Sequence, residues 1–226
     1  MKLTKLLGLL LLLTMACSFP VFAEGQAEPA AKDKIVVGFS QIGAESAWRV
    51  ANTESIRSEA EKRPNIELIF SDAQQKQENQ IKAIRSFIAQ GVDVIAFSPV
   101  VESGWAPVLK EAKAAGIPVI LSDRAVDVED DSLWVTFMGS DFVEEGRRAG
   151  KWLIEFLGGK GAKVVELVGT VGSAPANDRY SGFREAIAGN PEIEIIKSQS
   201  GDFTRAKGKE VMEAFLKASG EEIDVL

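Results

Sequence analysis

Short apolar runs alternate along this chain with longer segments of helical periodicity, and this alternation restricts the possible folds more than any other feature. Seven runs are predicted to be buried strands, at residues 35–40, 66–71, 92–98, 117–122, 133–138, 163–168 and 193–198. Ile81, Ile84 and Ile88 show helical spacing in one intervening segment, and Gly91 follows where a left-handed C-cap is expected. Strand–helix–strand repetition requires crossover connections and favours a mainly parallel sheet covered on both faces. The pattern therefore predicts a doubly wound α/β fold.

Residues 1–23 have the pattern of a secretory signal peptide. Lys2 and Lys5 give a positive start, residues 6–13 are apolar, and Val21-Phe22-Ala23 resembles a cleavage site. The apolar run is shorter than the roughly 20 residues that a membrane-spanning helix needs. We therefore expect an exported, periplasmic protein that does not itself span the membrane.

Cys17 leaves a second reading of the leader open. Thr14-Met15-Ala16-Cys17 weakly resembles a lipoprotein box, in which the cysteine would be acylated and would anchor the chain. Thr14 stands where such boxes usually carry leucine, so simple cleavage is the favoured reading. Residues 24–33 are polar and rich in alanine, and we expect a disordered linker there.

The composition argues against several classes of protein. There is no histidine, which excludes serine–histidine triads, histidine general bases and histidine metal sites. The formal net charge of −7 disfavours nucleic acid as a partner, because such binding needs a basic face. Cys17 is the single cysteine, so its loss with the leader would leave neither disulfide nor thiolate chemistry. We expect no enzyme activity, no cofactor and no metal.

A domain boundary is predicted near Gly139-Ser140-Asp141, where one strand ends and a helix over 142–156 begins. Gly158-Gly159-Lys160-Gly161 follows a helix and precedes a strand, which is the wrong order for a phosphate-binding loop and indicates a turn. Residues 223–226 look like the opening of another buried strand.

Polar side chains follow most of the predicted strands. They are Ser40-Gln41, Ser71-Asp72, Ser98-Pro99, Ser122-Asp123-Arg124 and Ser200-Gly201-Asp202. In an open α/β sheet, ligands bind beyond the carboxyl ends of the strands, so these groups point to a site for a polar solute. Asp and Arg match vicinal hydroxyls, and Trp48, Trp105 and Phe203 could cover the apolar face of a sugar. Asp72 could also cap the helix that follows it.

Each of these residues also has a purely structural reading. Asp123-Arg124 could form a surface ion pair or a loop cap, and Trp48 could be the first core residue of its helix. Trp105 fits a packing anchor better than a ligand contact. Arg49 could be solvated, and an arginine early in a helix, such as Arg179, is commonplace.

Four longer stretches resemble the sugar-binding proteins of bacterial ABC importers, of the ribose and galactose type. They are residues 38–49, 75–83, 121–124 and 198–205, and the resemblance extends from Lys34 to Leu226. It implies two Rossmann-like lobes with parallel sheets, residues 34–139 and residues 140–226, joined by three crossing segments. The lobes would close around one monosaccharide, galactofuranose-like or another aldose, and present it to a membrane permease. The complete protein is expected to be a monomer.

The same resemblance assigns the sugar contacts. Trp48, Asp123, Arg124, Arg179 and Phe203 would occupy sugar-contacting positions, and Ser46 and Arg49 join them because they lie in the first strand–helix loop. The family's remaining polar contacts to the sugar, and two of the three segments that connect its lobes, would fall beyond Leu226. We therefore expect a second lobe that is incomplete in this chain, and we predict that these 226 residues alone bind sugar poorly.

Other functions stay open at this point. A sensor for chemotaxis or a kinase could use the same closed surface. An exported sugar-processing enzyme would need two carboxylates flanking a bond, but Arg124 beside Asp123 favours the ionised form of that carboxylate. A regulator of the lactose-repressor family shares the fold but would begin with a helix–turn–helix, where this chain has residues 6–13 of the apolar leader.

Overall fold

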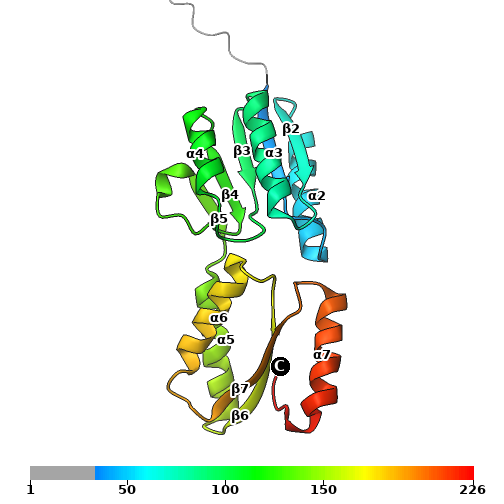
Figure 1. The fold of residues 1–226 in the computed structure, drawn as a ribbon, viewed down its shortest axis with the longest axis vertical. Helices are drawn as coiled ribbons and strands as arrows, with labels where there is room; N and C mark the ends of the chain where they lie inside the picture. The colour runs from blue at the N-terminus through cyan, green and yellow to red at the C-terminus, as the bar shows by residue number, and fades with distance from the viewer. Residues whose placement is uncertain (1–33) are drawn as a thin grey trace, which may run out of the picture. The chain divides into compact units, whose positions relative to one another are not determined.

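The computed structural model describes residues 34–226, so the predicted signal peptide, Cys17 and the linker lie outside the described residues. Within that range the chain forms two parallel sheets with flanking helices (Figure 1). The first sheet has the order β2-β1-β3-β4-β5 and the second pairs β6 with β7. This is the α/β, Rossmann-like architecture that the strand–helix alternation predicts.

The first sheet is built by residues 35–139. Its strands are β1 (Ile35–Gln41), β2 (Ile66–Asp72), β3 (Val94–Phe97), β4 (Val119–Asp123) and β5 (Thr136–Gly139), and its helices are α2 (Ala47–Glu61), α3 (Gln77–Gln90) and α4 (Ala106–Ala114). The strand order reverses direction after β2, so right-handed crossovers place α2 on the face opposite α3 and α4 (Figure 1). Ile84 and Phe87 of α3 and Leu109 of α4 pack on Ile95 and Leu121, all of them at most 2% exposed.

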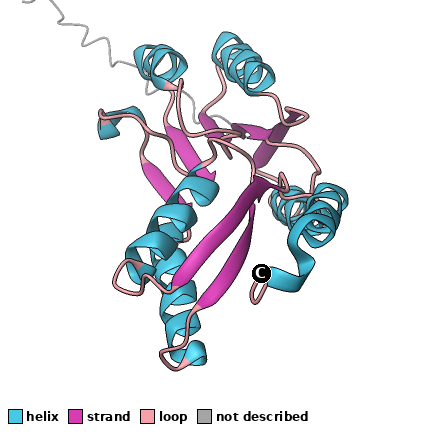
Figure 2. Cartoon of the chain, turned by 60° about the horizontal axis from the view of Figure 1, so that its bottom comes forward, coloured by secondary structure: helices cyan, strands magenta, loops and turns pink. Residues whose placement is uncertain are grey.

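The second sheet and its helices are built by residues 142–226. It contains β6 (Ala162–Val168) and β7 (Ile193–Ser200), with α5 (Phe142–Leu157), α6 (Ala174–Ile187) and α7 (Arg205–Ser219) around it. Because side chains alternate along a strand, Val164 packs on Leu153 and Ile187, whereas Val165 packs on Val211 of α7. Helices α5 and α6 therefore cover one face of the sheet and α7 covers the other (Figures 1 and 2).

Residues 223–226 extend the second sheet by one contact. Val225 pairs in parallel with Val164, and the Val165 N–H donates to the Val225 carbonyl at 2.9 Å. The short 3₁₀ helix η2 (Gly220–Glu222) turns the chain into this position after α7. The predicted strand opening is thus present as a single bridge on β6.

Three predicted strand starts need correction, since β3 begins at Val94 rather than at residue 92, and β5 and β4 also begin later than predicted. Leu133 belongs to the 3₁₀ helix η1 (Asp131–Leu133), and β5 starts only at Thr136. The strand is also exposed rather than buried, with Met138 59% exposed, because it lies at the edge of the first sheet. Strand β4 begins at Val119, since the Ile117 N–H donates to a helical carbonyl of α4 and Pro118 has no N–H to give.

One predicted helix cap is confirmed and another is wrong. Gly91 adopts the left-handed conformation expected of a C-cap, with φ of 64°. Asp72 does not cap the next helix: its Oδ1 accepts from the Gln74 N–H at 2.7 Å, and α3 begins only at Gln77. The carboxylate therefore stabilises the turn before the helix, in which Gln74 and Gln75 both have positive φ.

Among residues 34–226, no helix is both long enough and apolar enough to cross a lipid bilayer.

Candidate functional site

A pocket of about 390 Å³ lies beyond the carboxyl ends of β1 and β4. Its lining includes all seven residues expected from the sequence to contact a ligand: Ser46, Trp48, Arg49, Asp123, Arg124, Arg179 and Phe203. Five further residues complete it: Glu45, Ser140, Phe142, Glu145 and Pro175. The structure therefore brings together, around one cavity, side chains that are up to 158 positions apart in the sequence.

Arg49 is the most deeply buried charge of the pocket, with 2% of its surface exposed. Its Nη2 lies 2.6 Å from Asp123 Oδ2, and its Nε donates to Glu45 Oε1 at 3.2 Å. Nη1 reaches Asn52 Oδ1 at 3.4 Å and Ser98 Oγ at 3.5 Å. The solvated reading of Arg49 is therefore wrong, and the guanidinium holds two carboxylates in place.

Asp123 ends β4 in the left-handed region, with φ of 67°. The next N–H, of Arg124, donates to the Ser122 carbonyl at 2.8 Å and closes a tight three-residue turn around Asp123. Such a conformation is uncommon for a residue with a side chain, although Asp tolerates it better than most. The turn directs the Asp123 carboxylate toward Arg49, which fixes it by the ion pair.

Arg124 is also buried, at 3% exposure, so it is not part of a surface ion pair. Its Nη1 donates to the Val100 carbonyl at 3.0 Å, and its guanidinium lies 5.4 Å from the ring centre of Phe203. Burial, followed by the nearby positive charge of Arg49, lowers the pKa of Arg124 to about 10. The side chain therefore remains protonated at neutral pH.

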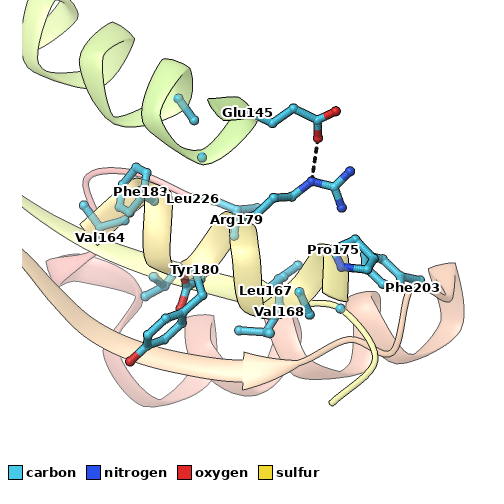
Figure 3. Close-up of a pocket in the computed structure, with 16 residues that line it drawn as sticks. Glu145, Val164, Leu167, Val168, Pro175, Arg179, Tyr180, Phe183, Phe203 and Leu226 are labelled. Carbon is cyan, nitrogen blue, oxygen red and sulfur yellow. Dashed lines mark hydrogen bonds and ion pairs between the residues drawn. The ribbon is translucent and has the colours of Figure 1, made fainter. Parts of the chain in front are cut away.

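Arg179 enters the pocket from α6. Its Nε donates to Glu145 Oε2 of α5 at 2.8 Å (Figure 3). Its guanidinium also lies over the Phe142 ring, at 4.6 Å from the ring centre. Glu145 was not singled out in the sequence, because the 34 positions between the partners leave no local pattern. The pair joins the first turn of α5 to the second turn of α6 at the pocket wall.

The two tryptophans beside the predicted strand ends have different environments. Trp48 is 56% exposed and lies in the pocket lining, so it is not a core residue of its helix. Trp105 is fully buried, packs on Phe97 and donates from Nε1 to the Val101 carbonyl at 2.7 Å, as its reading as a packing anchor predicts. Ser46 caps α2 by accepting from the Arg49 N–H at 3.2 Å.

Phe203 reaches the pocket through an unusual backbone. Both Asp202 and Phe203 have positive φ, and the Phe203 ring lies directly on Gly169. A Cβ at Gly169 would come within 1.9 Å of that ring, so only glycine permits this position.

Buried polar atoms without a partner remain beside the paired charges. They are Glu45 Oε2, Arg124 Nε and Ser40 Oγ. Buried polar groups in native structures are usually hydrogen-bonded, so such atoms at a pocket suggest places where a ligand or water would donate or accept. Glu45 was missed in the sequence, although its spacing of four residues from Arg49 in a helix start was a usable signal.

A larger pocket, of about 540 Å³, adjoins this one and shares Glu145, Pro175, Arg179 and Phe203 with it (Figure 3). Its other walls are mainly aliphatic and aromatic side chains of α5, α6 and β6. The smaller pocket is the better candidate for a polar ligand, because it alone of the two contains Trp48, Arg49, Asp123 and Arg124.

Known proteins share both the sequence and the fold of this chain. It is 60% identical over 184 residues to the galactofuranose-binding protein of Escherichia coli K12, and the aligned region covers 81% of this chain and 58% of that protein. A protein from Mycobacterium smegmatis in complex with β-D-fucofuranose superposes with a TM-score of 0.79 at 57% identity, over 84% of this chain and 63% of that one.

A third relative is the periplasmic binding component of the arabinose ABC transporter from Shewanella sp. ANA-3, bound to α- and β-L-arabinofuranose. It superposes with a TM-score of 0.77 at 58% identity, over 82% of this chain and 61% of its own. The chain thus spans about three fifths of the length of these relatives. Residues 37–226 match the periplasmic binding protein domain. Because this match covers most of the chain, it shows that the chain belongs to the periplasmic binding protein family.

Proposed function

We propose that this protein is a periplasmic solute-binding protein that captures a neutral monosaccharide in its furanose form and delivers it to an ABC import permease. The proposal rests on the pocket, where an exposed indole lies beside paired guanidinium and carboxylate groups and where Glu45 Oε2 and Arg124 Nε have no hydrogen-bond partner. In this proposal residues 34–139 and residues 140–226 are two lobes, and the boundary at Gly139 lies between the sheets.

The charge balance of the pocket favours a neutral ligand. Its three guanidinium groups, Arg49, Arg124 and Arg179, face the three carboxylates Glu45, Asp123 and Glu145. Ion pairs at 2.6–3.2 Å already occupy Arg49 and Arg179. A sugar acid or sugar phosphate would add an uncompensated negative charge, whereas a neutral polyol adds none.

The hydrogen-bonding groups suit a polyol. Charged donors and acceptors that are fixed in one plane can serve neighbouring hydroxyls in both directions. Trp48 offers an apolar face, held in place by the Arg49 guanidinium 4.7 Å from its ring centre. The furanose ring is proposed because one similar protein is a galactofuranose-binding protein and two others have structures with fucofuranose or arabinofuranose bound.

Capture requires no covalent step. The sugar would be contacted from both lobes, by residues 45–49 and 123–124 on one side and by Arg179 and Phe203 on the other. It would shift the equilibrium toward the closed conformation by the difference between its binding free energies for the closed and open forms. The closed form then offers a surface for the permease. The signal peptide at residues 1–23 would place the protein outside the cytoplasm.

Titration calorimetry tests the proposal. The chain is titrated with L-arabinose and D-galactose, which equilibrate between ring forms, and with D-galacturonate as the anionic counterpart. We expect weak, saturable binding of a neutral sugar and none of the uronate. Asp123→Asn removes one charge-assisted partner, which contributes about 1.5–3 kcal/mol, so it should weaken binding by at least about tenfold.

Arg85→Lys is the matched control, because Arg85 forms its ion pair with Glu111 on an exposed surface away from the pocket. Unchanged affinity in the Asp123→Asn variant, or stronger binding of the uronate than of either neutral sugar, would contradict the proposal.

A further inference from the structure

Glu102, in the loop between β3 and α4, makes two hydrogen bonds to the second lobe. Its backbone N–H donates to the Gly172 carbonyl at 2.9 Å, and its Oε1 accepts from Asn177 Nδ2 at 2.6 Å. Asn177 lies in the first turn of α6, and neither it nor Glu102 lines the candidate pocket. We propose that Glu102 and Asn177 form a clamp that holds the two lobes together independently of any ligand.

The first-lobe side of the clamp is firmly anchored. The fully buried Gln80 accepts from the Val100 N–H at 2.9 Å and donates to the Ser98 carbonyl at 2.7 Å. The buried Trp105 donates to the Val101 carbonyl, and the Asp127 N–H donates to the carbonyl of Glu102 itself at 2.6 Å. The loop therefore presents Glu102 from a fixed position rather than from a free chain.

The second-lobe side is fixed in the same way. The Ser173 hydroxyl donates to the Thr170 carbonyl at 2.7 Å, and the Ser173 N–H donates to the same carbonyl at 3.1 Å. The Asn177 N–H is held by the Ser173 carbonyl at 3.0 Å. Val101 also lies against the position that a Gly172 side chain would fill. Because both segments are already ordered, little conformational entropy is lost when the hydrogen bond between them forms. More of the bond's free energy is therefore available to stabilise the contact between the lobes.

The clamp is connected to the pocket at both ends. The Val100 carbonyl, two residues before Glu102, accepts from Arg124 Nη1 at 3.0 Å. Helix α6, which carries Asn177, also carries Pro175 and Arg179 of the pocket lining. If part of the protein is already closed before the sugar binds, closure costs less free energy. The apparent affinity for the sugar is then proportional to the fraction of molecules that are closed.

The test measures the distance between the lobes without any sugar. Spin labels are attached to cysteines introduced by Lys110→Cys in α4 and Lys151→Cys in α5, and both positions are exposed. The background variant is Cys17→Ser, which removes the chain's own cysteine. Pulsed electron paramagnetic resonance then gives the distance distribution. Glu102→Ala should lower the ratio of closed to open molecules about tenfold, because an acceptor that is charged is lost.

A partner exchange separates the clamp from a general loss of structure. Glu102→Gln replaces the carboxylate acceptor by a neutral amide oxygen and should retain more of the closed population than Glu102→Ala. Asn177→Asp places a second carboxylate against Glu102 and should open the lobes. The double variant with both changes restores a donor–acceptor pair and should close them again. A wild-type distribution in Glu102→Ala, or a double variant as open as Asn177→Asp alone, would overturn the clamp.

The effect of the clamp on sugar affinity rests on the proposed function, whereas the distance measurement does not. If the wild-type chain binds none of the sugars but the distances respond as described, the proposed function fails and the clamp stands. If sugar binds and the distances ignore Glu102, the clamp alone is wrong.

Discussion

Arg49 illustrates what burial does to a charged side chain in this pocket. Moving a guanidinium out of water costs several kcal/mol, and ion pairs offset that cost only when the geometry is good. Arg49 meets this condition through Glu45, Asp123, Asn52 and Ser98. Its donors are largely committed to protein partners, so we expect it mainly to position the two carboxylates. Arg124, with its Nε unpartnered, has more to offer a ligand.

Asp178 gives a prediction about pH. Burial, and then the nearby Asp141 carboxylate, raise the pKa of Asp178 in the folded protein. A raised folded-state pKa in a carboxyl group means that stability increases as the pH falls through that pKa, and that the ionised form is disfavoured at neutral pH. Asp178→Asn should therefore raise the free energy of unfolding at pH 7, by up to about 0.5 kcal/mol for a half-exposed site.

Urea unfolding at pH 7 and near the unfolded-state pKa, about 3.9, checks this prediction. The gain should shrink at the lower pH, where the wild-type carboxyl group is also neutral. Thr204→Ala serves as control, because it removes the cap of α7, which accepts from the Lys207 N–H at 3.2 Å, without removing a charge, and should cost about 1 kcal/mol. A loss of stability in Asp178→Asn at pH 7 would show that the carboxylate is favourable there.

The sequence was informative about pocket residues that stand at strand ends and less so about their partners. Asp123 and Arg124 were predicted because ligands bind beyond the carboxyl ends of parallel strands. Glu145 could not be found this way, because its position depends on how α5 packs against α6. Ser140 directly follows β5, so the same rule could have found it. Burial of Arg49 likewise depends on partners from three separate segments.

At the scale of elements, glycines allow α5 and α6 to pack closely. A Cβ on Gly182 of α6 would lie 2.0 Å from the Val143 carbonyl oxygen, and one on Gly146 of α5 would lie 2.3 Å from the Arg179 carbonyl oxygen. Both obstacles are backbone atoms, which cannot rotate away. The close approach brings Glu145 to within 2.8 Å of Arg179, so the packing also shapes the pocket.

Gly182→Ala should therefore destabilise the protein by about 1–3 kcal/mol, as overpacking does, despite the better helix propensity of alanine. Gly208→Ala in α7 is the matched control, since its Cβ would meet only Leu167, at 3.9 Å. That change should be neutral or stabilise the helix by up to about 1 kcal/mol. Thermal unfolding of both variants decides the matter: equal melting temperatures would contradict the role of Gly182.

The alternation of apolar runs predicted every strand of the described residues, but it placed the starts of β3, β4 and β5 too early. β1 and β6 lie within one residue of their predicted ends, because buried strands read as continuous apolar runs. β5 was misjudged, since an edge strand buries only part of its surface. The start of α3 was misjudged because two left-handed glutamines precede it, a conformation that propensity does not anticipate.

At the scale of the whole molecule, the pocket depends on two sheets that are built from different parts of the chain. Residues 45–49 and 123–124 follow strands of the first sheet, whereas Arg179 and Phe203 follow strands of the second. A change in the relation between the lobes would therefore separate Arg124 from Phe203 and Arg49 from Arg179. Sugar capture in this pocket would therefore depend on lobe closure, to which the Glu102 clamp contributes from outside the pocket.

The most direct measurement follows the indole N–H signals of the ¹⁵N-labelled chain by nuclear magnetic resonance while a neutral sugar is added. Trp48 and Trp152 are comparably exposed, at 56% and 60%, but only Trp48 lines the pocket. L-arabinose should move the Trp48 signal in a saturable way and leave the Trp152 signal in place, and D-galacturonate should move neither. A Trp48 signal that stays fixed at saturating sugar, or that moves only in step with Trp152, would contradict the central claim.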